Sequence, residues 1–228
     1  ELLLTPQSRL DAPPLALDAP GRLRAAQRVA LYFCQDERFA QDLATLDTLG
    51  PWAECVFEAA GPLPERLTLF TSGSTGEPKA VPKLVRDFEQ DAACVLESFP
   101  DVRRILPLLG ITHIYGFILT LMCSKLLDAP WEDWRFRSAQ AIVEGLRPGD
   151  LLVGVPQHWR LIASMNLPFP PDVYGTTGGA PALMDVWHTV KSLGLTRLGE
   201  IYGSTECGLV GFRPDLDEPL ALPTYWRR

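Results

Sequence analysis

One nine-residue segment combines the side chains and backbone that suit a polyphosphate. It runs from Thr71 to Lys79 with the sequence TSGSTGEPK. Its glycines allow backbone N–H groups to turn toward an anion, its hydroxyls donate further hydrogen bonds, and its lysine adds a positive charge. We therefore expect a phosphate-binding loop formed by Thr71, Ser72, Gly73, Ser74, Thr75, Gly76 and Lys79.

This loop differs from that of the P-loop nucleotide triphosphatases. Counted from Gly73, the second glycine of that pattern would fall at Pro78, and no Gly-Lys-Ser or Gly-Lys-Thr follows. A flexible solvated turn would explain the glycines but not the hydroxyls followed by Lys79. A kinase-type or NTPase-type binder that uses this loop alone remains an alternative, and it would release phosphate rather than pyrophosphate.

Three later segments accompany the loop: HIYGF at 113–117, GTTGGAP at 175–181 and YGSTECG at 202–208. Taken singly, each has a plainer explanation, as a core histidine, a glycine turn or a solvated glutamate. Together with the loop, and in this order, they resemble the signature segments of the adenylate-forming superfamily. That superfamily contains acyl- and aryl-CoA synthetases, luciferases and the adenylation domains of peptide synthetases. The run His113-Ile-Tyr115 is most similar to the 4-coumarate:CoA ligase branch.

The resemblance implies how a nucleotide would be held. The loop would grip the β- and γ-phosphates of ATP, the Gly-Gly-Ala segment would face adenine with its backbone, Tyr202 would stack on the base and Thr205 would touch the α-phosphate. Glu206 would hold Mg²⁺, because a hard cation that bridges phosphates prefers carboxylate and water ligands. Beyond the loop, the implied nucleotide-binding residues are Gly178, Gly179, Ala180, Tyr202, Gly203 and Thr205.

The resemblance also implies a pocket for an acid. His113 matches the histidine that these enzymes place beside the bound carboxylate. Tyr115 would line the pocket, where its ring could stack on an aryl substrate and its hydroxyl could meet a polar substituent. A half-buried packing tyrosine is the alternative for Tyr115. The implied pocket residues are His113, Tyr115, Gly178, Gly203 and Gly208, and the implied catalytic residues are His113, Lys79, Thr205 and Glu206.

These assignments predict an enzyme that uses ATP and Mg²⁺ to activate a carboxylic acid, with an aromatic acid favoured. The carboxylate would form an acyl-adenylate and release pyrophosphate. A thiol of CoA or of a carrier-protein pantetheine would then displace AMP. A non-catalytic adenylate-binding module that serves as a sensor or scaffold remains an alternative. The sequence leaves the identity of the acid, the choice of thiol and the oligomeric state open.

The resemblance extends over the large domain of that superfamily. Its ribose-binding aspartate, its hinge and its small C-terminal domain with a catalytic lysine have no counterpart after Gly208. We therefore expect residues 1–228 to form a compact, truncated large domain. Such a domain would bind ATP and turn over slowly, because positive charge would be missing where negative charge develops in the transition state.

The elements that must position these segments alternate between strand and helix. A strand at 66–70 leads into the loop, and the apolar stripe from Leu84 to Phe99 predicts a helix after it, so the loop is expected between a strand and a helix. Residues 29–34 are predicted as a strand and 39–49 as a helix that Gly50-Pro51 ends.

The rest of the chain continues this alternation. Further strands are expected at 104–108, 151–155 and 198–201, and further helices at 116–127, 138–146, 157–163 and 182–193. The alternation predicts an α/β fold with a largely parallel sheet flanked by helices.

Composition narrows the class of protein. The chain has 228 residues with 21 Lys+Arg against 28 Asp+Glu, a net charge of −7. This balance argues against nucleic acid as a partner, because affinity for a phosphate backbone needs clustered cations. The length suits a single domain. The five cysteines are odd in number and lack metal-binding spacing, which indicates a reducing, cytoplasmic compartment.

One uncharged run, 105–124, has the length that spans a bilayer. Pro107, Gly110 and His113 interrupt its first half and would break or polarise a spanning helix. We therefore expect a strand, a loop and a buried helix there, and no membrane partner.

Overall fold

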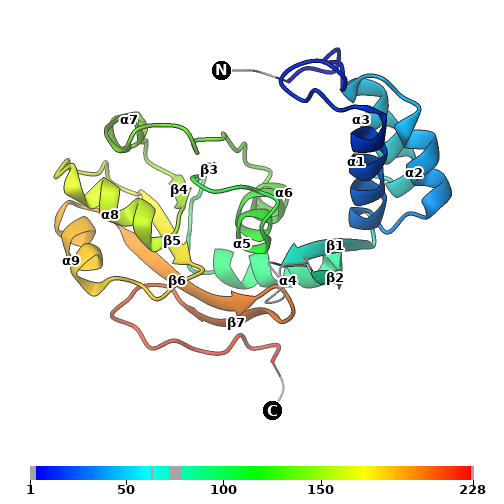
Figure 1. Cartoon of the computed structure of the whole chain (residues 1–228). Helices are drawn as coiled ribbons and strands as arrows, with labels where there is room; N and C mark the ends of the chain where they lie inside the picture. The colour runs from blue at the N-terminus through cyan, green and yellow to red at the C-terminus, as the bar shows by residue number, and fades with distance from the viewer. Residues whose placement is uncertain (1–3, 63, 72–78, 227–228) are drawn as a thin grey trace. The chain divides into compact units, whose positions relative to one another are not determined.

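The computed structural model describes residues 4–62, 64–71 and 79–226. Contacts divide the chain into two compact units, Glu1–Val85 and Arg86–Arg228 (Figure 1). The sequence predicted one compact domain over 1–228. Length alone could not separate these possibilities, because it bounds the number of cores without fixing it.

The first unit begins with three helices: α1 (Ala19–Tyr32), α2 (Glu37–Ala44) and α3 (Leu49–Ala60). The predicted strand at 29–34 is wrong, because residues 29–32 form the last turn of α1. That helix starts at an N-cap where the Asp18 side chain accepts a hydrogen bond from Gly21 N at 2.7 Å, and it buries Ala26 and Ala30 one turn apart. Packing of the helix therefore outweighs the β propensity of a short run.

Gly50-Pro51 opens α3 instead of ending a helix, so that prediction is wrong as well. Proline is tolerated in the first helical turn because the N–H groups there have no partner within the helix. Gly50 N donates to Pro6 O at 2.7 Å. The three helices enclose a small core of Leu10, Ala26, Leu43 and Trp52.

The first unit ends in a hairpin of β1 (Arg66–Thr71) and β2 (Lys79–Leu84), which pair antiparallel. The strand predicted before the glycine-rich loop is confirmed, but the loop joins two strands rather than a strand and a helix. The helix α4 (Val85–Leu96) starts only after β2. Pro82 argues against a strand at 79–84 when the sequence is considered alone. The structure accommodates it because both strands of a two-stranded sheet are edge strands.

The second unit is built on one five-stranded sheet. Its strands are β3 (Arg104–Pro107), β4 (Asp150–Val153), β5 (Tyr174–Gly178), β6 (Arg197–Ser204) and β7 (Gly208–Arg213), in the order β3-β4-β5-β6-β7. The first four run parallel and β7 pairs antiparallel with β6. The predicted α/β fold with a largely parallel sheet is thereby confirmed.

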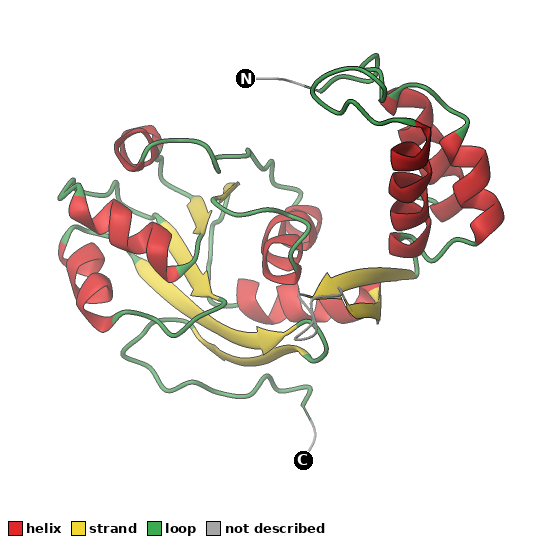
Figure 2. Ribbon diagram, viewed as in Figure 1, coloured by secondary structure: helices red, strands yellow, loops and turns green. Residues whose placement is uncertain are grey.

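Helices cover both faces of this sheet (Figures 1 and 2). They are α5 (Ile114–Gly116), the π-helix η1 (Phe117–Met122), α6 (Cys123–Leu127), α7 (Ala139–Gly145), α8 (Pro156–Ser164) and α9 (Met184–Ser192). In β5, Gly175 and Thr177 face α8 and α9, where Trp159 packs on Gly175. Thr176 and Gly178 face the opposite side, where Tyr115 of α5 lies.

The run at 105–124 forms β3, a loop and buried short helices, as expected. Among the described residues, no helix has both the length and the apolar character that a membrane crossing requires.

Candidate functional site

The carboxyl ends of the parallel strands bring several predicted site residues of the second unit to one edge of the sheet. Gly178, the last residue of β5, lies beside Ile201 of β6. The segment after β5 and the last residues of β6 therefore leave the sheet side by side. In open α/β sheets, ligands bind in the crevice outside this edge.

Glycines are required where these segments come close together. An added Cβ on Gly178 would lie 3.1 Å from Ile201 O and 3.2 Å from the Tyr115 ring. A Cβ on Gly203 would collide with Gly208 O across the β6–β7 turn. Gly179 has a φ of +78°, a left-handed conformation that glycine adopts without strain. These glycines therefore let the segments at this edge pack closely against one another.

Exposed side chains surround these glycines. Tyr202 is 61% exposed at the end of β6, and Ala180 is exposed after β5. The turn between β6 and β7 carries Thr205, which is half-buried, and Glu206, which is exposed. Ser204 Oγ accepts a hydrogen bond from Cys207 N at 3.2 Å and so helps to shape the turn. The structure thus presents an aromatic ring, a hydroxyl and a carboxylate from one short stretch.

His113 lies at the entrance to the helical segment that follows β3. It is the N-cap of α5, it is exposed, and its backbone N–H donates to Gly110 O at 3.3 Å. Gly116, one turn later, packs so closely that an added Cβ would collide with Gly110 O. The helix that follows is a π-helix, a form that is uncommon and often found at functional sites.

Tyr115 lies beneath the same edge and is only 7% exposed. Its hydroxyl lies 2.9 Å from Gly154 O and 2.9 Å from Thr176 Oγ1. Burial raises the pKa of this hydroxyl, so it stays protonated and can donate to the carbonyl. The sequence analysis expected this hydroxyl to meet a substituent on a substrate, and in the structure it contacts Gly154 and Thr176. Tyr115 supports Gly178 from below with its ring, which agrees with the packing alternative.

Gly208 is the first residue of β7 and is buried. Its φ is +75°, and an added Cβ would lie 2.6 Å from Asp91 Oδ2. Asp91 comes from α4, and the sequence pattern gave it no role, because a single acid in a helical stripe carries no signal of its own. The structure places its carboxylate directly against the β6–β7 turn.

His158 is a second residue at this edge that the sequence motifs did not single out. It lies in the first turn of α8, just after β4, and its Nδ1 accepts a hydrogen bond from Val155 N at 3.2 Å. Burial lowers the pKa of this imidazole, which favours the neutral form that can accept. Its place three residues after a predicted strand was the one available signal.

The predicted phosphate-binding loop lies within the first unit. Thr71 and Lys79 are opposite each other at the end of the β1–β2 hairpin, with Thr71 half-buried and Lys79 exposed. The hairpin therefore fixes both ends of the loop. The predicted residues between them, namely Ser72, Gly73, Ser74, Thr75 and Gly76, lie outside the described residues.

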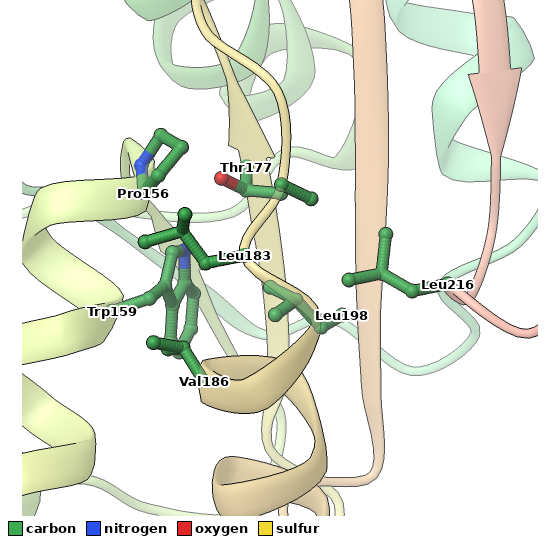
Figure 3. Close-up of a pocket in the computed structure, with 8 residues that line it drawn as sticks. Pro156, Trp159, Thr177, Leu183, Val186, Leu198 and Leu216 are labelled. Carbon is green, nitrogen blue, oxygen red and sulfur yellow. The ribbon is translucent and has the colours of Figure 1, made fainter.

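The other face of β5 holds a small cavity against α8 and α9 (Figure 3). Its volume is about 10 Å³, and Thr177, Leu183 and Trp159 are among the residues that line it. The Thr177 hydroxyl is buried and has no hydrogen-bond partner among the described residues. A volume of this size admits at most one water molecule, so this cavity is no substrate pocket.

Within the described part of the chain, no group of three or more His, Cys, Asp or Glu side chains is arranged to hold a metal ion.

Comparison with known proteins gives concordant results. The family model described as AMP-binding enzyme matches residues 19–225. The 4-coumarate–CoA ligase of Cereibacter sphaeroides is 34% identical over 92% of this chain and 53% of its own length. That of Halorhodospira halophila is 29% identical over 98% of this chain and 56% of its own length. The chain thus spans about half the length of these relatives.

The fold has solved counterparts. The O-succinylbenzoate coenzyme A synthetase of Bacillus subtilis, solved with ATP and a magnesium ion, superimposes with a TM-score of 0.56 and 19% identity. The alignment covers 64% of this chain and 32% of that chain. At this level of identity the likeness is one of fold.

Proposed function

The chain belongs to the family of AMP-binding enzymes, and from this premise we propose that it binds Mg²⁺-ATP and takes part in converting a carboxylic acid to an acyl-adenylate and then to a thioester. The observation that carries the proposal is the arrangement at the carboxyl edge of the sheet. There the close-packed glycines at 178 and 203 lie with exposed Tyr202 and Glu206 on adjoining segments.

The nucleotide fits this edge by its chemistry. Tyr202 is exposed enough for its ring to stack on a base, and Gly179 and Ala180 offer backbone groups next to it. The hydroxyl of half-buried Thr205 would donate to a phosphate oxygen. Bound Mg²⁺ would neutralise phosphate charge, and Glu206 is the carboxylate that would hold it.

The proposed reaction has two balanced steps. A carboxylate oxygen of the acid attacks the α-phosphorus of ATP, the bond to the β-phosphate bridging oxygen breaks, and pyrophosphate leaves. A thiolate then attacks the acyl carbon, and the C–O bond to AMP breaks. His113, exposed beside the strand ends, would donate a hydrogen bond to the acid carboxylate and orient it. Lys79, from the loop hairpin, would bind a phosphate.

For the acid we propose an aromatic compound, and for the thiol acceptor CoA. The relatives at 34% and 29% identity are both named 4-coumarate–CoA ligases, which supports an aryl acid and CoA over a fatty acid and a carrier protein. A carrier-protein pantetheine is the alternative acceptor, and thioester formation on addition of free CoA would favour CoA over it.

The test begins with binding of ATP to the chain, measured by titration calorimetry with and without Mg²⁺. It continues with ATP–pyrophosphate exchange in the presence of 4-coumarate, benzoate, hexanoate or palmitate. We expect Mg²⁺-dependent nucleotide binding and slow exchange that is fastest with an aryl acid. Binding without exchange for any acid would favour the non-catalytic module. Release of phosphate instead of pyrophosphate would favour the kinase-type alternative, and best exchange with palmitate would exclude the aryl acid.

A further inference from the structure

A buried carboxylate contacts the strand that follows the turn with Thr205 and Glu206. Asp91 of α4 is 6% exposed, and its Oδ2 accepts a hydrogen bond from Leu209 N at 3.0 Å. Leu209 is the second residue of β7 and lies opposite Gly203 at the end of β6. The contact therefore joins α4 to the hairpin three residues after Glu206.

The C-terminal segment completes the attachment of Leu209. The Tyr225 hydroxyl donates to Asp91 Oδ1, and Trp226 Nε1 donates to Leu209 O at 2.7 Å. Side chains from outside the hairpin thus bind both backbone polar groups of Leu209. Burial and the neighbouring Asp91 raise the pKa of the Tyr225 hydroxyl, so it remains a donor to the carboxylate.

The turn itself is shaped to admit this carboxylate. Gly208 has a φ of +75°, and the space where its Cβ would stand is taken by Asp91 Oδ2 at 2.6 Å. Gly208 pairs with Ser204, and these two residues close the turn at 205–207. A larger residue at 208 would both strain the backbone and displace the carboxylate.

We propose that Asp91 is a positioning residue, which holds the β6–β7 turn and thereby keeps Glu206 where a magnesium–nucleotide complex needs it. The magnesium part of this inference rests on the proposed function. The physical reason is the narrow geometry that Mg²⁺ demands of its ligands, which a carboxylate on a short turn meets only when the turn backbone is fixed. A charged acceptor also binds a backbone N–H more strongly than a neutral one does.

The test compares Asp91→Ala and Asp91→Asn with the matched control Asp215→Asn. Asp215 is 7% exposed and also accepts several hydrogen bonds, from Trp187 Nε1 at 2.8 Å and Lys191 Nζ at 2.7 Å among others, but it has no contact with the turn among those seen. Hydrogen exchange of residues 204–209 reports on the turn. ATP affinity with Mg²⁺, divided by ATP affinity in EDTA, reports on the metal.

For Asp91→Ala we expect faster exchange at 204–209 and a loss of Mg²⁺ dependence of about ten-fold, similar to that of Glu206→Gln, with affinity in EDTA nearly unchanged. Asp91→Asn keeps the shape and one acceptor oxygen, so both effects should be smaller and in the same direction. If Asp91→Ala does not fold, the same two measurements on Asp91→Asn test the proposal. Asp215→Asn should lower the thermal midpoint and change neither measurement.

Unchanged exchange at 204–209 in both Asp91 variants, or an equal increase in Asp215→Asn, would overturn the proposal. Increased exchange in the Asp91 variants alone supports the positioning of the turn. If in that case the wild type and Glu206→Gln show the same Mg²⁺ dependence, the magnesium site of the proposed function is wrong while the role of Asp91 in the turn stands.

Discussion

At the scale of single residues, the charges of Glu206 and Lys79 give the most direct test of the proposed nucleotide binding. A hydrogen bond to a charged group contributes about 1.5–3 kcal/mol, which corresponds to a ten-fold change or more in affinity. We therefore expect Glu206→Gln and Lys79→Ala each to weaken Mg²⁺-ATP binding by about ten-fold in titration calorimetry. Glu218→Gln changes another exposed carboxylate of the second unit and serves as the control. Equal affinities in all variants would contradict both assignments.

Variants of Tyr115 distinguish a side chain that stabilises the fold from one that contacts a substrate. Its hydroxyl is bound to Gly154 O and lies against Thr176, and its ring packs under Gly178. Tyr115→Phe should cost about 0.5–1.5 kcal/mol in unfolding free energy, because one buried hydrogen bond is lost. Tyr115→Ala should cost about 3–5 kcal/mol, because it leaves a cavity beneath the strand end. Urea denaturation measures both values.

Tyr115→Phe also tests whether the hydroxyl contacts a substrate. If Tyr115→Phe selectively slows pyrophosphate exchange with hydroxylated aryl acids while benzoate is unaffected, the hydroxyl contacts a substituent after all. An equal effect on both acids would agree with the position seen in the structure.

At the scale of elements, the sequence foresaw the parallel strands better than the elements that depend on glycine or on close packing. β3 and β4 are largely apolar runs and were predicted, and residues 198–201 of the more polar β6 were predicted as well. β5 reads Tyr-Gly-Thr-Thr-Gly, in which Gly175 is needed because a Cβ there would collide with the Trp159 ring. That contact joins residues 16 positions apart, so no short sequence pattern around Gly175 indicates a strand. The same limit explains why residues 29–34 were mistaken for a strand.

The sequence motifs named candidate site residues but not the residues that hold them in place. The motifs identified Gly178, Tyr202 and Glu206, and the strand order brings these to one edge of the sheet. Asp91 was missed because its partners, Leu209 and Tyr225, lie more than 100 residues away in the chain. A buried carboxylate is recognised by such partners, which only the fold assembles.

The half-buried imidazole of His158, in the first turn of α8, predicts how stability depends on pH. In the folded chain burial lowers its pKa, so the unfolded chain takes up a proton first as the pH falls through about 6.5. Stability from this residue is therefore present above that pH and decreases below it. We expect His158→Gln to show a smaller loss of thermal midpoint between pH 7 and pH 5.5 than the wild type. Parallel curves for the two proteins would contradict this role.

At the scale of the whole molecule, each unit has a hydrophobic cluster among its described residues. The first unit has its own cluster around Leu10, Leu43 and Trp52. The second unit has a larger one, in which Leu152 of β4 packs with Trp159 and other residues between the sheet and α7–α9. Both leucines are 0% exposed, so their truncation removes comparable side chains from two different interiors.

This arrangement predicts that truncating a core side chain lowers the stability of its own unit much more than that of the other unit. Leu43→Ala and Leu152→Ala should each cost about 2–5 kcal/mol locally, since each leaves a leucine-sized cavity. Hydrogen exchange followed by mass spectrometry should show lost protection in α1–α3 for Leu43→Ala, while β3–β6 stay protected, and the reverse pattern for Leu152→Ala. If either variant exposes both units to the same degree, the chain unfolds as a single cooperative body and the division at Val85 has no thermodynamic meaning.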